Sequence, residues 1–320
     1  MKLLVTGAAG FIGSHVVDLC LSKGHQVVGI DNFNDYYDVS IKENNVSRHV
    51  LHPHYELVRD DIENEEALRR VFSQNKIDAV IHLAARAGVR PSLERPLDYV
   101  KTNILGTTGI LNEMVRSGVK KMVFASSSSV YGNCAAEFFS EDLKVTEPIS
   151  PYAATKSACE QLCYTYHHLY GIKTVCLRFF TVYGPRQRPD LAIRKFIDKI
   201  ERGDPIRVYG DGTTRRDYTF VADIVDGIYR AVAYEGSGYE IINLGGGEPI
   251  TLKRMIETIE KVLGKSAQIV HMPMQPGDVE KTVCDWSKAR RLLGYSPKTK
   301  FEDGIRKFVE WRSEEHEKSI

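Results

Sequence analysis

Strand-like and helix-like segments alternate along the first half of the chain, and this order limits the fold more than any other feature of the sequence. Short apolar runs typical of buried strands occupy residues 2–6, 26–30, 56–58, 78–82, 122–126 and 174–178. Segments with helical periodicity lie between them, including 11–21, 97–115 and 153–170. Such strand–helix units predict an α/β fold with a doubly wound parallel sheet. A ligand of this sheet is expected beyond the carboxyl ends of its strands.

The alternation loosens after residue 178. A segment rich in Gly, Pro and Arg at 183–190 precedes a helical segment at 191–202 and several short apolar pieces, which we interpret as a smaller α+β lobe. A helical segment at 221–232 and a strand-like segment at 240–244 are expected to return to the first domain. The predicted division is 1–178 plus 217–247 for the sheet domain and 179–216 plus 248–320 for the lobe.

Charge and cysteine content exclude several classes of protein. Lys and Arg number 43 and Asp and Glu 42, so a formal charge of +1 gives no reason to expect nucleic acid or a membrane as partner. The six cysteines are too few and too irregularly spaced for a disulfide framework or a zinc site. The apolar stretch at the N-terminus is too short for a signal peptide. We therefore expect a cytoplasmic protein without a bound metal.

Three glycines follow the first expected strand. Gly7, Gly10 and Gly13 lie between strand 2–6 and helix 11–21, with Phe11 and Ile12 among them. In this position a glycine turn brings backbone N–H groups and a helix N-terminus against a pyrophosphate. The spacing differs from the common dinucleotide pattern, and a turn without a ligand remains the alternative.

Asp31 closes the second expected strand, 18 residues after Gly13. A carboxylate there can accept the hydroxyls of an adenosine ribose and repel a 2′-phosphate, so it predicts NAD rather than NADP. Asn32 follows where an arginine would favour NADP, and a local turn at the strand end is the alternative interpretation. Further candidates for cofactor contacts follow the third and fourth strands and are Asp61, Ile62, Leu83, Ala84 and Ala85.

Tyr152 and Lys156 are four residues apart on a helix that begins near Pro151, so their side chains share one face. A tyrosine that acts as a base near pH 7 needs its pKa lowered by roughly three units from about 10, and a lysine ammonium one turn away acts in that direction. Ser127 ends the fifth strand among four consecutive serines and is the candidate hydroxyl between Tyr152 and a substrate. A surface contact and a polar turn are the alternatives.

These residues together resemble the extended short-chain dehydrogenase/reductase family of nucleotide-sugar enzymes, and the resemblance covers essentially the whole chain. It implies a Rossmann-type fold and a tightly held NAD. It also implies that a hydride leaves C4 of a UDP- or dTDP-sugar while the tyrosinate takes the hydroxyl proton. Lys156 and Ser127 would support the tyrosine, and Asn103 would contact the cofactor.

Within the family, the residues beside the catalytic hydroxyl separate the activities. The 4,6-dehydratases carry Asp-Glu where this chain has Ser128 and Ser129, and UDP-glucuronate decarboxylases carry Glu at the second position and Asn where this chain has Thr181. With Arg188 and Arg90, the pattern is similar to the UDP-glucuronate 4-epimerases. UDP-glucose 4-epimerase, the decarboxylase and a non-catalytic NAD-dependent binding or regulatory protein remain alternatives.

A 4-keto uronate is a β-keto acid that loses carbon dioxide readily when its carboxylate stands perpendicular to the ring carbonyl. We expect hydroxyls of Ser128, Ser129 and Thr181 and the guanidinium of Arg188 to hold the carboxylate out of that alignment, since arginine can bind a carboxylate at two points. The resemblance further implies that Arg216 contacts the diphosphate, Asp278 the uridine ribose and the main chain near Val208 the base.

The helical segments 97–115 and 153–170 carry apolar residues on more than one face. Helices of this kind usually bury both faces. In the family that the chain resembles, such a pair builds a four-helix bundle between subunits, so a homodimer is expected.

Overall fold

The structure is a computed structural model that describes residues 1–273 and 281–318. Its main sheet has the strand order β10-β6-β5-β4-β1-β2-β3, and every neighbouring pair in it is parallel. The strands are β1 (Lys2–Thr6), β2 (Gln26–Asp31), β3 (Tyr55–Arg59), β4 (Ala79–His82), β5 (Lys121–Ser127), β6 (Lys173–Phe179) and β10 (Tyr239–Leu244). The predicted doubly wound α/β fold is confirmed.

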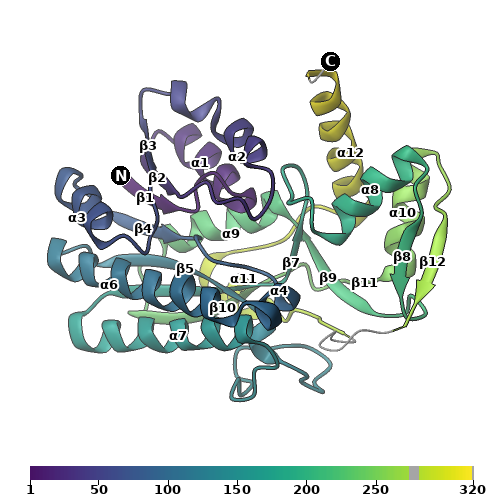
Figure 1. The fold of residues 1–320 in the computed structure, drawn as a ribbon. Helices are drawn as coiled ribbons and strands as arrows, with labels where there is room; N and C mark the ends of the chain where they lie inside the picture. Colours follow the sequence, from purple (N-terminus) through teal and green to yellow (C-terminus); the bar gives the residue numbers. More distant parts are fainter. Residues whose placement is uncertain (274–280, 319–320) are drawn as a thin grey trace.

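Helices cover both faces of this sheet (Figure 1). On one face lie α1 (Phe11–Ser22) and α9 (Val221–Ala233), and on the other lie α3 (Glu65–Gln74), α6 (Gly106–Ser117) and α7 (Pro151–Tyr170). Side chains alternate between the two cores, as the strand period of two requires. Leu3 and Val5 belong to the core under α1 and α9, whereas Leu4 belongs to the core under α3, α6 and α7.

The helical segment expected at 97–115 has a different internal structure. It consists of α5 (Pro96–Tyr99), a π-helical turn η2 (Val100–Leu105) and then α6. A π turn widens the helix locally, and a period of 3.6 in the sequence does not reveal it. Asn103 lies in this turn.

The lobe carries two small sheets. Strands β7 (Thr181–Tyr183), β9 (Arg215–Phe220) and β11 (Pro249–Thr251) form one, and β8 (Ile206–Tyr209) pairs with β12 (Ile269–Met272) in the other. Their helices are α8 (Ala192–Arg202), α10 (Leu252–Leu263) and α12 (Phe301–Lys318). The remaining described elements are α2 (Val39–Val46), η1 (His49–Leu51), α4 (Val89–Glu94), η3 (Ser128–Tyr131) and α11 (Ser287–Leu293).

Strand β10 returns to the main sheet beside β6, as expected for the segment at 240–244. The exact division into 1–178 plus 217–247 and 179–216 plus 248–320 stays a prediction. No helix within the described residues is long and apolar enough to cross a membrane.

At the two ends of the turn between β1 and α1, only a glycine fits. Gly7 adopts a φ of +68°, in the left-handed region. A Cβ on Gly13 would lie 2.0 Å from the carbonyl oxygen of Gly7, and a Cβ on Gly7 would lie 2.9 Å from the backbone nitrogen of Ala84. The close approach of α1, the turn and the segment after β4 therefore depends on these two residues.

We predict that Gly13→Ala lowers the free energy of unfolding by about 2 kcal/mol, because the added methyl forces the turn away from α1. Gly10→Ala is the matched control, since its Cβ would meet only the Gly7 oxygen, at 3.2 Å. Urea denaturation of both variants measures the difference. Equal stability of the two would show that the turn is not tightly packed.

Candidate active site

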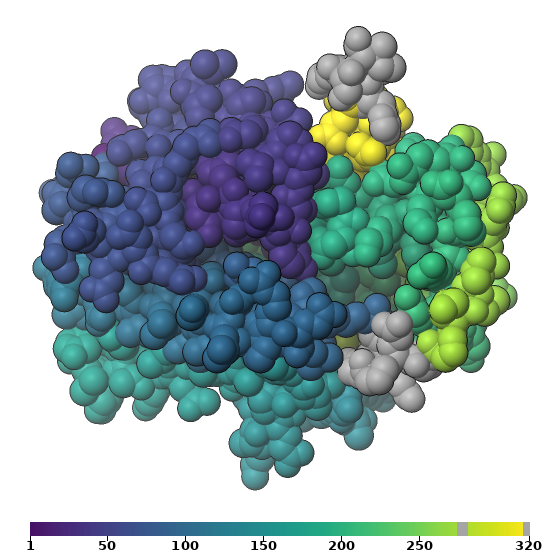
Figure 2. All heavy atoms as spheres, in the orientation of Figure 1, coloured from purple at the N-terminus to yellow at the C-terminus, as the bar shows by residue number. Residues whose placement is uncertain are grey.

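A pocket of about 400 Å³ lies at the carboxyl ends of β1, β2, β4 and β5, and Figure 2 shows the surface hollowed where the N-terminal segments meet the green lobe. Predicted residues line it at both ends. Those of the predicted cofactor end are Gly7, Gly10, Phe11, Ile12, Gly13, Asp31, Asn32, Asp61, Ile62, Leu83, Ala84 and Ala85. Those of the predicted catalytic end are Ser127, Ser128, Ser129, Tyr152, Lys156, Thr181 and Arg188.

The N-terminus of α1 lies at this pocket, which Gly10, Phe11, Ile12 and Gly13 line. Gly10 caps the helix without a side-chain hydrogen bond, and its first turn holds no acidic residue. The helix dipole and these N–H groups favour an anion. The glycine turn therefore fits the pyrophosphate of a dinucleotide.

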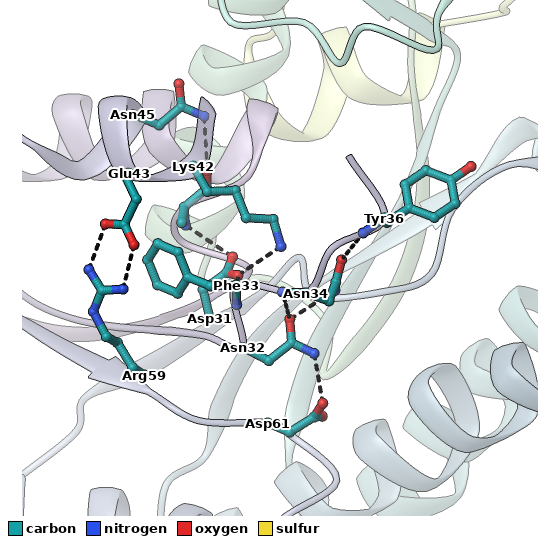
Figure 3. Close-up of polar contacts among 11 residues, drawn as sticks. Asp31, Asn32, Phe33, Asn34, Tyr36, Lys42, Glu43, Asn45, Arg59 and Asp61 are labelled. Atoms are coloured by element: carbon teal, nitrogen blue, oxygen red, sulfur yellow. Dashed lines mark hydrogen bonds and ion pairs between the residues drawn. The ribbon is translucent and has the colours of Figure 1, made fainter. Parts of the chain in front are cut away.

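Asp31 is buried at the end of β2 and is held by three donors (Figure 3). Its Oδ2 accepts the N–H of Ala9 at 3.2 Å, and its Oδ1 accepts the N–H of Phe33 at 2.9 Å and the Lys42 ammonium at 3.1 Å. A carboxylate offers about four acceptor positions. An acceptor position near Oδ2 is therefore left for the ribose, and contact with its hydroxyls stays a prediction.

Thr6 joins the end of β1 to the end of β4. Its Oγ1 accepts the N–H groups of Leu83 at 3.1 Å and Ala84 at 3.0 Å, and its hydroxyl lies 2.7 Å from His82 Nδ1. Burial lowers the pKa of His82 to about 3, so the ring is neutral and accepts from Thr6 at Nδ1. The Nε2–H then donates to Thr107 Oγ1 at 3.0 Å. These bonds keep the floor of the pocket in place.

Asn103 does not line the pocket. Its side chain bonds the backbone of Arg86 in both directions, accepting from the N–H at 2.8 Å and donating to the carbonyl at 3.1 Å. The amide also donates to Thr155 Oγ1 at 3.0 Å. Asn103 thus ties the segment after β4 to α7, and its contact with a cofactor stays a prediction.

Tyr152 and Ser127 both line the catalytic end of the pocket. Burial raises the pKa of Tyr152, while the Ser127 hydroxyl and the charge of Arg188 act in the opposite direction. Lys156 is buried one turn further along α7, donates to the Ala125 carbonyl at 2.7 Å and has its pKa lowered by burial to about 8. The ammonium form of Lys156 therefore predominates at pH 7.

Arg188 reaches the pocket already paired. Its Nε and Nη2 donate to the two carboxylate oxygens of Asp190 at 2.9 and 2.7 Å, and the side chain is 16% exposed. The guanidinium also stacks on Tyr36, 5.2 Å from the ring centre. Asp190 thus occupies the edge formed by Nε and Nη2, and the edge formed by Nη1 and the second N–H of Nη2 remains for a ligand.

Three of the described residues predicted to bind substrate are not in the pocket lining. Arg90 on α4 lies over the Tyr209 ring at 5.1 Å, and Val208 is buried in the neighbouring strand β8. Arg216 on β9 donates to the Arg215 carbonyl at 2.9 Å. Asp278 lies outside the described residues. Among the described residues, no group of His, Cys, Asp and Glu could hold a metal ion.

A sequence model described as GDP-mannose 4,6 dehydratase matches residues 4–308. A UDP-glucuronate 4-epimerase from Thermodesulfobacterium geofontis is 47% identical over 312 residues, which cover 97% of this chain and 96% of that protein. The chain belongs to the extended short-chain dehydrogenase/reductase family of nucleotide-sugar enzymes.

Solved structures of this family agree with the fold. The UDP-glucuronic acid 4-epimerase of Bacillus cereus, in complex with UDP-glucuronic acid and NAD, is 38% identical with a TM-score of 0.92, over 98% of this chain and 99% of that one. The UDP-glucose 4-epimerase of Thermotoga maritima with UDP-glucose is 33% identical with a TM-score of 0.91, over 99% and 100% of the two chains. The resemblance stated from the motifs is confirmed.

Sequence reasoning missed functional positions on the segment after β2. Lys42 and Asn45 lie one turn apart on α2, where Lys42 bonds Asp31 and Asn45 donates to the Ala9 carbonyl at 2.9 Å. Tyr36 and Tyr37 also line the pocket. The signal available was the spacing of Lys42 and Asn45, which places both on one face of a helix after a strand-end carboxylate.

We predict that Lys42→Met lowers the free energy of unfolding by about 1–3 kcal/mol, because the Asp31 carboxylate stays buried without its ion pair. Binding of NAD should also weaken, since Asp31 is no longer held in one orientation. Urea denaturation and titration calorimetry measure the two effects. The exposed Lys76 provides the control variant Lys76→Met, and a Lys42 variant indistinguishable from it in both measurements would contradict the role of the pair.

Proposed function

We propose that this protein is an NAD-dependent UDP-glucuronate 4-epimerase, which interconverts UDP-glucuronate and UDP-galacturonate. One observation carries the proposal. Ser127, Tyr152 and a glycine turn line one pocket, together with Ser128, Ser129 and Thr181. None of the described residues that line this end of the pocket is acidic.

The chemistry requires a base at the C4 hydroxyl. It also requires that the keto-sugar can rotate in the site, so that its opposite face meets the cofactor. NAD, when bound, accepts the hydride from C4 and returns it to the opposite face. Tyr152 takes the proton of the C4 hydroxyl and later returns it. The hydroxyl of Ser127 lies between Tyr152 and the substrate. Lys156 supplies positive charge behind Tyr152. No net oxidation results, so the enzyme is an isomerase.

Retention of the carboxylate distinguishes this reaction from decarboxylation. Hydroxyls from Ser128, Ser129 and Thr181 can hold the uronate carboxylate away from the perpendicular alignment with the C4 carbonyl. Arg188 adds the donors of its edge formed by Nη1 and Nη2, because Asp190 holds only the edge formed by Nε and Nη2. A serine at position 129 also avoids the like-charge repulsion that a glutamate would exert on the substrate carboxylate.

The nucleotide would lie toward the lobe. We infer that Arg216 and Asp278 meet the diphosphate and the uridine ribose and that Arg90 and the backbone of Val208 meet the nucleotide. The contact of Arg90 with Tyr209, adjacent to Val208, supports a common location for the last two. Closure of the lobe over the ligand would bring Arg216 nearer to the pocket.

We predict that the wild-type protein with NAD converts UDP-glucuronate to UDP-galacturonate with little release of carbon dioxide. Tyr152→Phe should lower kcat by at least about 100-fold, because the proton acceptor is lost, while NAD binding is retained. Anion-exchange separation of the uronates and the pentose products measures the outcome.

Two results would contradict the assignment. UDP-pentose as the main product would indicate a decarboxylase, and conversion of UDP-glucose at a higher kcat/KM than UDP-glucuronate would indicate the neutral-sugar epimerase. Undiminished turnover by Tyr152→Phe would remove Tyr152 from the role of base.

We further infer a homodimer through the helices of the 97–170 region. Large apolar side chains stand exposed on α5, η2 and α7 and are Leu97 (72% exposed), Leu105 (59%), Leu169 (59%) and Tyr164 (54%). Burying such side chains is favourable, at about 25 cal/mol for each Å².

A cytoplasmic location is supported by the six cysteines, all of which are free thiols.

We predict that sedimentation at micromolar concentration gives a species of twice the chain mass of 36.1 kDa. Leu97→Glu should shift it to the monomer, because a charge would enter the apolar interface. Leu51→Glu is the control, since Leu51 is 83% exposed on η1, away from these helices. A wild-type protein that sediments only as a monomer would contradict the dimer.

A further inference from the structure

The segment 32–38 between β2 and α2 reaches both ends of the pocket. Asn32, at its start, lines the cofactor end and donates to Asp61 at 2.7 Å (Figure 3). Tyr36, further along, lines the pocket beside Arg188. One short segment therefore contacts the two regions assigned to the two ligands.

Side-chain to backbone hydrogen bonds give this segment a defined shape. Asn32 Oδ1 accepts the N–H of Asn34 at 3.1 Å and its side-chain amide at 2.8 Å, and Asn34 Oδ1 accepts the N–H of Tyr36 at 3.3 Å. Phe33 is held at a φ of +48° beneath the guanidinium of Arg59, which lies 4.1 Å from the ring centre. These consecutive Asx turns determine where Tyr36 stands.

The two tyrosines of the segment support two different cations. The Lys42 ammonium, which pairs with Asp31, lies 5.5 Å from the centre of the Tyr37 ring. The Arg188 guanidinium, which pairs with Asp190, lies 5.2 Å from the centre of the Tyr36 ring. The two rings contact each other edge to face, 6.5 Å between centres. The two tyrosine rings in contact thus connect Lys42 at the cofactor end with Arg188 at the catalytic end.

Arg188 is consequently restrained by Asp190 at its edge and by Tyr36 on its face. An arginine side chain has several rotatable bonds and loses considerable rotamer freedom when it is fixed. A guanidinium already fixed by an aromatic face and a carboxylate meets an anionic ligand with less ordering cost.

We propose that Tyr36 is a positioning residue for uronate recognition, which holds the Arg188 guanidinium with Nη1 toward the substrate carboxylate. The Asn32–Asn34 turns set the place of Tyr36 and so tie this contact to the cofactor end. This inference rests on the proposed function. It assigns the preference for a carboxylated sugar partly to Tyr36, in addition to the hydroxyls of Ser128, Ser129 and Thr181.

The test compares Tyr36→Ala with Tyr36→Phe, which keeps the ring and loses only the hydroxyl. Each variant is assayed with NAD for kcat and KM toward UDP-glucuronate, and binding of UDP-glucose and of NAD is measured by calorimetry. We expect Tyr36→Ala to raise KM for UDP-glucuronate roughly fivefold, in line with the loss of one cation–π contact. Tyr36→Phe should stay within about twofold of wild type, and binding of UDP-glucose and of NAD should be unchanged in both.

The second comparison concerns the turns that place the ring. Asn34→Ala removes the acceptor for the Tyr36 N–H and should raise KM for UDP-glucuronate in the same direction as Tyr36→Ala. In the double variant Tyr36→Ala/Asn34→Ala the two effects should not add, because both act through the position of one ring.

The outcomes separate this inference from the function on which it rests. A wild-type protein that converts UDP-glucuronate while Tyr36→Ala keeps its KM overturns the positioning role alone. Equal losses toward UDP-glucuronate and UDP-glucose, or loss of NAD affinity, would indicate a general structural role and also overturn it. A wild-type protein that converts no UDP-glucuronate overturns the proposed function and this inference together.

Discussion

The hydrogen bonds of Thr6, which join the ends of β1 and β4, are the contact on which the rest of the site depends. Parallel pairing brings the carboxyl ends of β1, β2, β4 and β5 to one edge, and Thr6 Oγ1 fixes the segment from Leu83 to Ala84 beside the glycine turn. The glycine turn allows the backbone N–H groups at the start of α1 to face the pocket. Neutral His82 continues the connection to Thr107 behind the sheet.

Two of the charged groups that line the pocket are held in ion pairs. Asp31 is matched by Lys42 and Arg188 by Asp190, each at about 3 Å. A net charge of +1 for the whole chain therefore says little about the electrostatics that a ligand meets. Each pair leaves part of its polar edge open, Oδ2 of Asp31 and Nη1 of Arg188. Asp31 and Arg188 can therefore meet a charged ligand without either of them being an uncompensated charge beforehand.

The sequence predicted those parts of the site that follow from local periodicity. The strand–helix order, the glycine turn, Asp31 and the pair Tyr152 and Lys156 each depend on short spacing, and the structure brings all of them to one pocket. The sequence did not predict the roles of Lys42 and Tyr36, because their contacts with Asp31 and Arg188 depend on how α2 and the segment before it fold. The bonds of Asn103 to the backbone of Arg86 depend on the π turn, which the periodicity does not reveal, and its contact with a cofactor stays a prediction. Pairing of Arg188 with Asp190 depends on the loop conformation that no spacing rule describes.

Removal and return of the same hydrogen at C4 is the central claim, and isotopic labelling tests it most directly. UDP-glucuronate carrying deuterium at C4 would be incubated in ordinary water with the protein and NAD, and the UDP-galacturonate formed would be analysed by mass spectrometry. The account predicts that the product keeps the deuterium at C4, because the hydride never exchanges with water. Product that has lost the deuterium would contradict the account.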